Sequence, residues 1–204
     1  MTKRLDAKKK VSRALSVNLW GKANDPFLKR NYRPGQHGTA LKRDTTYGNQ
    51  LKAKQKLKKY YANMNETQFK NLFTKAKKEK GDTAQNFVGM LERRLDAVIY
   101  RANFVPTFYA ARQVINHKHI MVNGKTVNIA SYMVKPGDVI SVREKSRKIP
   151  LIADSLARMD REVPVYMDLN AADFSVKFNA VPKLEDIPYE VPMEINLIVE
   201  FYSR

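Results

Sequence analysis

Residues 91–143 read LERRLDAVIYRANFVPTFYAARQVINHKHIMVNGKTVNIASYMVKPGDVISVR, and this stretch decides the fold. Apolar residues recur at helical spacing from Leu91 to Ile99, which predicts one amphipathic helix continuing to about Arg101. The segment from Asn103 to Pro106 should end it. Thr107 is then a predicted N-cap for a second helix. The buried stripe of this second helix is expected to contain Ala111, Val114 and Ile115.

A β-hairpin signal follows the two helices. Asn123-Gly124 supplies the two positive-φ residues of a type I′ turn, and the flanking runs Ile120–Val122 and Thr126–Ile129 predict its strands. Lys135–Asp138 has Pro and Gly where a type II turn needs them, so a third strand is expected at Val139–Val142. A basic run of residues 143–148 comes next.

Several basic residues of this module lie beside the apolar stripes, so we expect them to be mainly exposed and to contact a polyanion. They are Arg93, Arg94, Arg112 and Lys118, with Lys125 added by the hairpin turn. His117 and His119 raise the question of zinc. Histidines two positions apart on a helix point to nearly opposite sides, and no carboxylate cluster accompanies them, so no metal site is expected.

The runs LERRLDAVIYRANF and ARQVINHKHIMVNGKTVNIASYMVKPGDVISVREKSR resemble the RNA-binding domain named after small-subunit ribosomal protein four. This domain also occurs in RNA-modifying enzymes and one class of tRNA synthetase, so alone it implies only RNA binding. Three further segments resemble bacterial-type small-subunit ribosomal protein four itself: PGQHG at residues 34–38, the segment 47–56, and IVEFYSR at residues 198–204. The resemblance therefore covers nearly the whole chain.

The resemblance implies a structural constituent of the small ribosomal subunit, with no enzymatic activity and no cofactor. Such a protein binds a multi-helix junction in the 5′ domain of small-subunit rRNA, nucleates assembly of the subunit body and contributes to translational accuracy. Implied partners are this rRNA, small-subunit ribosomal protein five and mRNA near the channel through which it enters. The alternatives are a ribosome-associated factor or an RNA-modifying enzyme using the same module. One departure is Phe108, where the family usually has Arg.

The charge distribution supports a polyanionic partner independently of the resemblance. The 204 residues carry a formal net charge of +18. Residues 1–90 contribute +16, residues 91–150 contribute +7 and residues 151–204 contribute −5, so the acidic last third should face away from the polyanion or toward a basic protein. No run of apolar residues approaches the length of a membrane span, and no signal peptide is recognisable, which favours the cytoplasm.

Residues 1–45 are predicted to form a basic arm that is weakly ordered until it docks on RNA. The chain has no cysteine, so the zinc site found in this arm of some relatives is not expected. Glycines around Gln36 and His37 suit close approach of backbone to phosphate, which makes RNA contact a better reading of His37 than catalysis. The expected RNA-binding residues of the arm are Lys8, Lys9, Lys10, Arg13, Arg33, Gln36, His37, Lys42 and Arg43.

A lysine-rich helix is predicted from about Thr46 to Met64. Its lysines repel one another without interleaved acids, which suggests an external counter-charge. The RNA-binding candidates here are Gln50, Lys52, Lys54, Lys56, Lys58 and Lys59. Further helices are expected from Asn65 to Gly81, from Thr83 onward, and over residues 152–161. A second hairpin is expected over residues 165–178.

The predicted fold class is α+β, with a small α/β RNA-binding domain of two helices on a short antiparallel sheet inserted into a mainly helical domain. The expected divisions are a basic arm at 1–45, a helical rRNA-binding domain at 46–91 completed by about 183–204, and an α/β domain at 92–182 that contains the RNA-binding module at about 93–156. Helix and strand patterns both fit residues 194–202. The sequence contains no Ser-His-Asp context, phosphate-binding loop or dinucleotide fingerprint.

Overall fold

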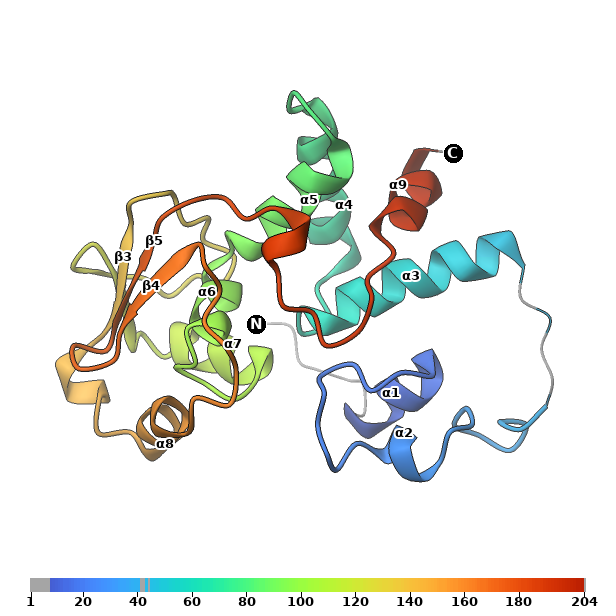
Figure 1. Ribbon diagram of the computed structural model, residues 1–204, viewed down its shortest axis with the longest axis horizontal. Helices are drawn as coiled ribbons and strands as arrows, with labels where there is room; N and C mark the ends of the chain where they lie inside the picture. The colour runs from blue at the N-terminus through green and yellow to red at the C-terminus, as the bar shows by residue number, and fades with distance from the viewer. Residues whose placement is uncertain (1–7, 41–42, 44, 204) are drawn as a thin grey trace. The chain divides into compact units, whose positions relative to one another are not determined.

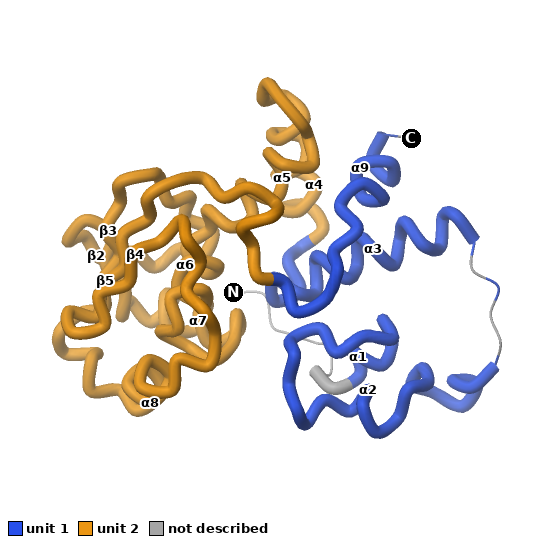
Figure 2. Tube along the Cα trace, in the orientation of Figure 1, with its two compact units in different colours: residues 1–65, 189–204 blue, residues 66–188 orange. Residues whose placement is uncertain are grey.

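The computed structural model describes residues 8–40, 43 and 45–203. Figure 1 shows its helices and strands. Contacts divide the chain into two compact units, which Figure 2 colours separately. Unit 1 comprises Met1–Asn65 and Tyr189–Arg204, and unit 2 comprises Glu66–Pro188. This partition does not test where independently folding domains begin and end, so the domain boundaries given above stay predictions.

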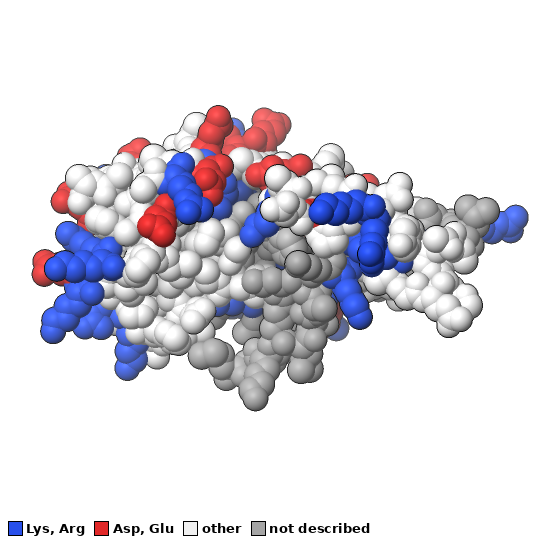
Figure 3. Space-filling view, turned by 90° about the horizontal axis from the view of Figure 1, so that it is seen from below, with Lys and Arg blue, Asp and Glu red and all other residues white. Residues whose placement is uncertain are grey.

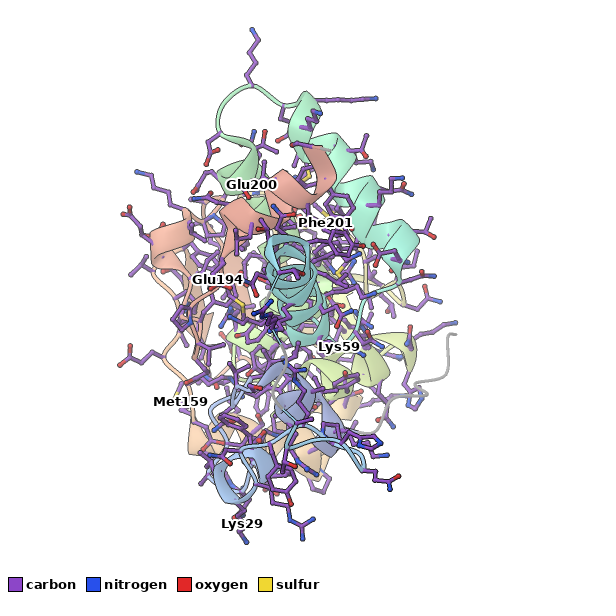
Figure 4. All side chains as sticks on the ribbon, turned by 90° about the vertical axis from the view of Figure 1, so that its right-hand side faces the viewer. Lys29, Lys59, Met159, Glu194, Glu200 and Phe201 are labelled. Atoms are coloured by element: carbon purple, nitrogen blue, oxygen red, sulfur yellow. The ribbon has the colours of Figure 1, made fainter. Side chains whose placement is uncertain are left out.

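Unit 1 is helical and is built around α3 (Thr46–Tyr60). Thr45 caps this helix, because its hydroxyl accepts a hydrogen bond of 3.1 Å from the backbone N–H of Gly48. The buried residues of α3 include Ala53 and Leu57. The C-terminal segment, for which the sequence fits helix and strand alike, is the helix α9 (Ile195–Ser203), and it packs on α3. Figure 4 looks along α3 and shows α9 lying against it.

The basic arm is folded within unit 1, so the expectation of weak order is wrong for the part of it that the structure describes. It forms α1 (Lys8–Leu15) and α2 (Pro26–Lys29). Asp25 caps α2 and also accepts a hydrogen bond of 2.6 Å from the buried hydroxyl of Ser12. Leu19 is completely buried, and Trp20 donates its indole N–H to the carbonyl of Tyr60. Apolar burial of this kind outweighs the repulsion among the cations of the arm.

Unit 2 begins with two helices, α4 (Glu66–Lys78) and α5 (Thr83–Glu92), that are joined by a short loop and lie side by side in Figure 1. Their contact is aromatic. Phe87 of α5 meets Phe69 and Phe73 of α4 edge to face, with ring centroids 5.1 and 5.5 Å apart. Asp82 caps α5 by accepting hydrogen bonds from two backbone N–H groups.

The module helices are α6 (Leu95–Arg101) and α7 (Phe108–Asn116), and Thr107 caps α7 as predicted. The single helix predicted from Leu91 to Arg101 is wrong, because the chain leaves the helical conformation between α5 and α6. Arg94 is extended and pairs with Met133 as an isolated β-bridge. Backbone hydrogen bonds join this corner to residues 130–134, and these long-range bonds replace the missing helical ones.

One antiparallel sheet of five strands, in the order β2-β1-β3-β5-β4, completes unit 2. The first hairpin joins β1 (Ile120–Val122) to β2 (Lys125–Thr126), and β3 (Val139–Val142) pairs on the other side of β1. Positive φ angles of 48° and 76° at Asn123 and Gly124 confirm the predicted turn. The return strand is shorter than expected, since it ends at Thr126.

The second predicted hairpin is present as β4 (Met167–Asn170) and β5 (Ser175–Phe178), and β5 extends the same sheet by pairing with β3. Short 3₁₀ helices occur at η1 (Glu144–Ser146) and η2 (Leu184–Asp186), and α8 (Pro150–Arg158) lies between β3 and β4 in sequence. Helices and one antiparallel sheet confirm the α+β class. No helix in the described part of the chain is long and apolar enough to cross a membrane.

Candidate nucleic-acid interface

The lysine-rich helix α3 uses part of its predicted RNA-binding face to hold α9. Lys54 is buried, and its ammonium lies 4.4 Å from the ring centroid of Phe201. Gln50 is also buried and donates a hydrogen bond of 2.9 Å to Glu200. Glu200 and Phe201 are labelled on α9 in Figure 4. These two candidates therefore have partners inside unit 1.

The other lysines of α3 are more accessible. Lys56 is half-buried and contacts both the carbonyl of Pro192, at 3.1 Å, and the carboxylate of Glu194, at 3.4 Å. Three more lysines are half-buried on the same helix: Lys52, Lys58 and Lys59. Because a lysine stem can lie along an apolar surface while its ammonium reaches water, partial burial is compatible with contact to phosphate.

In the arm, Arg13 organises the glycine turn. Its guanidinium donates hydrogen bonds of 3.1 and 3.2 Å to the carbonyls of Tyr32 and Arg33, and lies 4.8 Å over the Tyr32 ring. Gly38 is required at the end of the turn, because any side-chain carbon there would collide with the carbonyl of Arg33. This arrangement leaves Gln36 and His37 exposed at the turn.

The remaining arm candidates are exposed or lie beyond what can be described. Lys10 and Arg43 are exposed, and Arg33 is half-buried. The side chains of Lys8 and Lys9, and the whole of Lys42, lie outside the described residues.

The expectation that all four cations of the module helices are mainly exposed is wrong for Arg94. Its side chain is 3% exposed and makes two hydrogen bonds, of 3.0 and 2.7 Å, to the buried carboxylate of Asp96. Arg112 donates to the same carboxylate at 2.9 Å, and Arg93 donates to the carbonyl of Val134 at 3.1 Å. A buried carboxylate without cationic partners would be costly, and Arg94 and Arg112 supply these partners to Asp96.

Arg112 and Arg93 are nevertheless half-buried rather than enclosed, and Lys118 and Lys125 are exposed as expected. Lys118 has a positive φ of 62° directly after α7, and its carbonyl accepts a hydrogen bond of 3.1 Å from Arg143. Lys118 therefore lies where α7 leads into the first hairpin, and Lys125 lies at the turn of that hairpin.

Phe108 occupies the position at which the family usually has Arg. It is 1% exposed and stacks on Tyr100, with ring centroids 4.0 Å apart and an angle of 26° between the rings. The side chain therefore packs in the core of unit 2. It takes no part in the exposed surface.

His119 follows α7 directly before β1, and its side chain is half-buried. Burial lowers the pKa of His119 below 6.5, and the charges of His117 and Arg143 lower it further. Its Nδ1 lies 2.8 Å from the hydroxyl of Ser146. Across residues 8–40, 43 and 45–203, no three His, Cys, Asp or Glu side chains are grouped as a metal site requires.

The sequence-based set omitted exposed lysines in unit 2. Five lie on α4 and in the loop after it, and two more lie in the basic run after β3: Lys70, Lys75, Lys77, Lys78, Lys80, Lys145 and Lys148. Their signal in the sequence was a high density of lysine with few acids. Figure 3 shows Lys and Arg side chains gathered at its left edge, at the end of unit 2 that carries the sheet.

Cations displayed on folded helices, a glycine turn and a hairpin define a protein that binds a polyanion, of the nucleic-acid-binding class. Comparisons with known proteins narrow this class. The family model described as Ribosomal protein S4/S9 N-terminal domain matches residues 3–92, and the model of the S4 domain matches residues 93–140.

Full-length relatives agree with both family models. The chain is 53% identical to small ribosomal subunit protein uS4 of Pelagibacter ubique, 51% identical to that of Paracoccus denitrificans and 50% identical to that of Rhodospirillum rubrum. Each alignment covers 100% of both chains. The chain belongs to the family of small ribosomal subunit protein uS4, which confirms the resemblance found in the sequence.

Proposed function

We propose that this protein is a structural, non-catalytic component of the small ribosomal subunit that binds a multi-helix junction in the 5′ domain of small-subunit rRNA. The observation that carries the proposal is membership of the uS4 family over the full length of the chain, at up to 53% identity among the relatives cited above. The net charge of +18 and the exposed cations on both units supply the physical means.

The mechanism is electrostatic clamping. RNA helices that converge at a junction repel one another through their phosphates, and Lys or Arg side chains that contact several of them offset this repulsion while releasing counterions. Contact by single cations is independent of base sequence, so specificity comes from the shape of the folded junction. Early binding would then favour one geometry of the junction and nucleate assembly of the subunit body.

The predicted contact residues divide by burial into two roles. Those with accessible side chains are proposed to contact phosphate or backbone directly: Lys10, Arg33, Gln36, His37, Arg43, Lys52, Lys56, Lys58, Lys59, Arg93, Arg112, Lys118 and Lys125. Three buried ones are proposed to position these elements from within the protein: Gln50, Lys54 and Arg94. Arg13 is half-buried and is proposed to hold the glycine turn through its hydrogen bonds.

The acidic last third supports a protein partner. Residues 151–204 carry a net charge of −5, which suits contact with a basic protein rather than with RNA. We propose that this partner is small-subunit ribosomal protein five. We further propose that the protein contacts mRNA near the channel through which the mRNA enters the ribosome. Both contacts would contribute to translational accuracy.

The decisive experiment measures the affinity of the purified protein for folded 5′-domain rRNA and for an unstructured RNA of equal length. At physiological salt, the folded RNA should bind at least about tenfold more tightly, which corresponds to roughly 1.4 kcal/mol. Equal affinities for the two RNAs would contradict recognition of a junction and leave only nonspecific attraction between charges.

A further inference from the structure

The turn of the first hairpin contains a chemically reactive pair of residues, Asn123 and Gly124, which is the single Asn-Gly dipeptide in the sequence. In such a pair, the backbone nitrogen of Gly can attack the side-chain amide carbon of the preceding Asn, because Gly has no side chain to obstruct the attack. Asn123 is exposed. Apart from its chain neighbours, no described residue has an atom within 4 Å of the place where Gly124 would carry a Cβ. Solvent therefore has access to the turn.

The fold holds the side-chain amide of Asn123 at both of its polar atoms. Its Oδ1 accepts a hydrogen bond of 2.9 Å from the backbone N–H of Val139, and its Nδ2 donates one of 2.8 Å to the carboxylate of Asp138. The backbone N–H of Asn123 also donates, at 2.8 Å, to the carbonyl of Val139. We call these three hydrogen bonds the Asn123 latch. The latch joins the hairpin turn to the turn that precedes β3.

Asp138 is itself fixed within its turn. Its second carboxylate oxygen accepts a hydrogen bond of 2.8 Å from the backbone N–H of Lys135. Its carbonyl accepts one of 3.0 Å from the backbone N–H of Phe178, at the end of β5. Hydrogen bonds to an ionised carboxylate are stronger than those between neutral groups. The acceptor of the Asn123 amide is therefore both strong and held in place.

We propose that Asn123 is a deamidation site that the Asn123 latch protects while the module is folded. In the reaction, the backbone nitrogen of Gly124 forms a bond to Cγ of Asn123, and Nδ2 leaves as ammonia with the proton from that nitrogen. Water then opens the ring at either of its carbonyl carbons, which gives Asp or an isoaspartyl residue. Ring closure requires the side chain to turn away from Asp138 and Val139, so the latch opposes it. This proposal does not rest on the RNA-binding function proposed above.

Either product breaks the latch. A carboxylate oxygen replaces the Nδ2 donor and faces the carboxylate of Asp138, so an attraction becomes a repulsion between like charges. An isoaspartyl residue also adds a carbon to the main chain of a two-residue turn, and the length of a hairpin turn fixes the register of its strands. Because β1 pairs with both β2 and β3, a shift at this turn affects both pairings. Deamidation therefore acts as a one-way switch that loosens the first hairpin.

The test follows the mass of the peptide 119–125, which trypsin releases because it lies between the cleavage sites at Lys118 and Lys125. The full-length protein is incubated folded and in guanidinium chloride, and the replacement of an amino group by a hydroxyl is followed over time by mass spectrometry. The unfolded chain should react faster by at least about tenfold, which corresponds to about 1.4 kcal/mol of protection. Asn116 and Asn128, which precede His and Ile, are controls within the module and should react more slowly.

Two variants of Asp138 separate the latch from general unfolding. Asp138→Ala removes the acceptor of the Asn123 amide, and the folded variant should react about threefold to tenfold faster than the folded parent. Asp138→Asn keeps an acceptor oxygen and should stay close to the parent. Melts followed by circular dichroism show whether each variant is folded. Where Asp138→Ala does not fold, the comparison of folded and unfolded parent decides the matter by itself.

Four results would overturn parts of this proposal. A gain of mass at Asn116 or Asn128 before Asn123 in the unfolded chain would overturn the site. Equal rates in the folded and unfolded parent would overturn protection by the fold. A slower reaction in Asp138→Ala would overturn the latch, because the carboxylate would then be taking the proton from the nitrogen of Gly124. The deamidated fraction, separated by cation exchange, should melt at a lower temperature than the parent, and an unchanged Tm would overturn the switch.

Discussion

Asp96 shows how one residue redirects several others. Its carboxylate is 1% exposed in the first turn of α6, and it draws Arg94 into the core and Arg112 partly toward it. A sequence pattern places these arginines beside the apolar stripe, but it does not reveal a buried acid that needs them. Arg94 consequently supports the module from within.

Arg94→Ala should lower the free energy of unfolding by about 3 kcal/mol, because it leaves the buried Asp96 carboxylate without its main partner. Lys125→Ala, on the exposed hairpin, should stay within about 0.5 kcal/mol of the parent. Urea denaturation followed by circular dichroism measures both. A small effect at Arg94 equal to that at Lys125 would contradict its structural role.

His119 should make stability depend on pH. Its folded pKa lies below 6.5, so between the folded pKa and the unfolded value the unfolded chain binds more protons. The contribution of neutral His119 to the free energy of unfolding is therefore complete above about pH 6.5, and it is lost as the pH falls through the folded pKa. The charged groups facing the ring are His117 and Arg143, with the Ser146 hydroxyl at Nδ1.

We expect His119→Gln to unfold with a weaker pH dependence than the parent between about pH 7.5 and 5.5. Parallel urea titrations at three pH values in this range measure the difference. Curves of unfolding free energy against pH that are parallel for the two proteins would show that His119 does not contribute.

At the scale of elements, α3 divides its polar side chains between two tasks. Gln50 and Lys54 face α9, whose Glu200 and Phe201 receive them, while other lysines of α3 keep access to solvent. The contact between α3 and α9 thus buries the charge of Lys54, and it holds the C-terminal segment against α3. For this reason, the number of lysines on a helix does not give the number of its RNA contacts.

Lys54→Met should therefore separate packing from RNA binding. It removes the charge over the Phe201 ring but keeps an apolar stem, so unfolding should become about 1 kcal/mol easier. The salt dependence of RNA binding should not change. Lys125→Met serves as the exposed control, with a slope reduced by about 0.7 to 0.9. A comparable loss of slope at Lys54 would place it on the RNA-facing surface.

At the scale of the whole molecule, the two compact units are both basic on their surfaces, and unit 1 draws on both ends of the chain. The arm belongs to the folded part of unit 1 through Leu19 and Trp20, which are core-type side chains within an otherwise cationic segment. A basic, low-periodicity segment can therefore fold where a neighbouring helix offers apolar surface. The aromatic side chain of Trp20 was the available signal for this in the sequence.

The sequence by itself determined the local structure and the family. The Thr107 cap, the Asn123-Gly124 turn and the turn before β3 were predictable, because their conformations depend on the intrinsic backbone energies of a few adjacent residues. The cationic character also follows from composition alone, and the motifs of residues 34–38 and 198–204 already indicated the family.

Only the tertiary structure decided which charges are exposed and where helices end. The break between α5 and α6 depends on hydrogen bonds to residues 130–134, and the burial of Lys54 depends on Phe201, far along the chain. The helical state of α9 likewise depends on packing against α3, since its sequence fits both patterns. Partners remote in sequence set the balance between desolvation and pairing for each buried charge, and a local pattern contains no information about them.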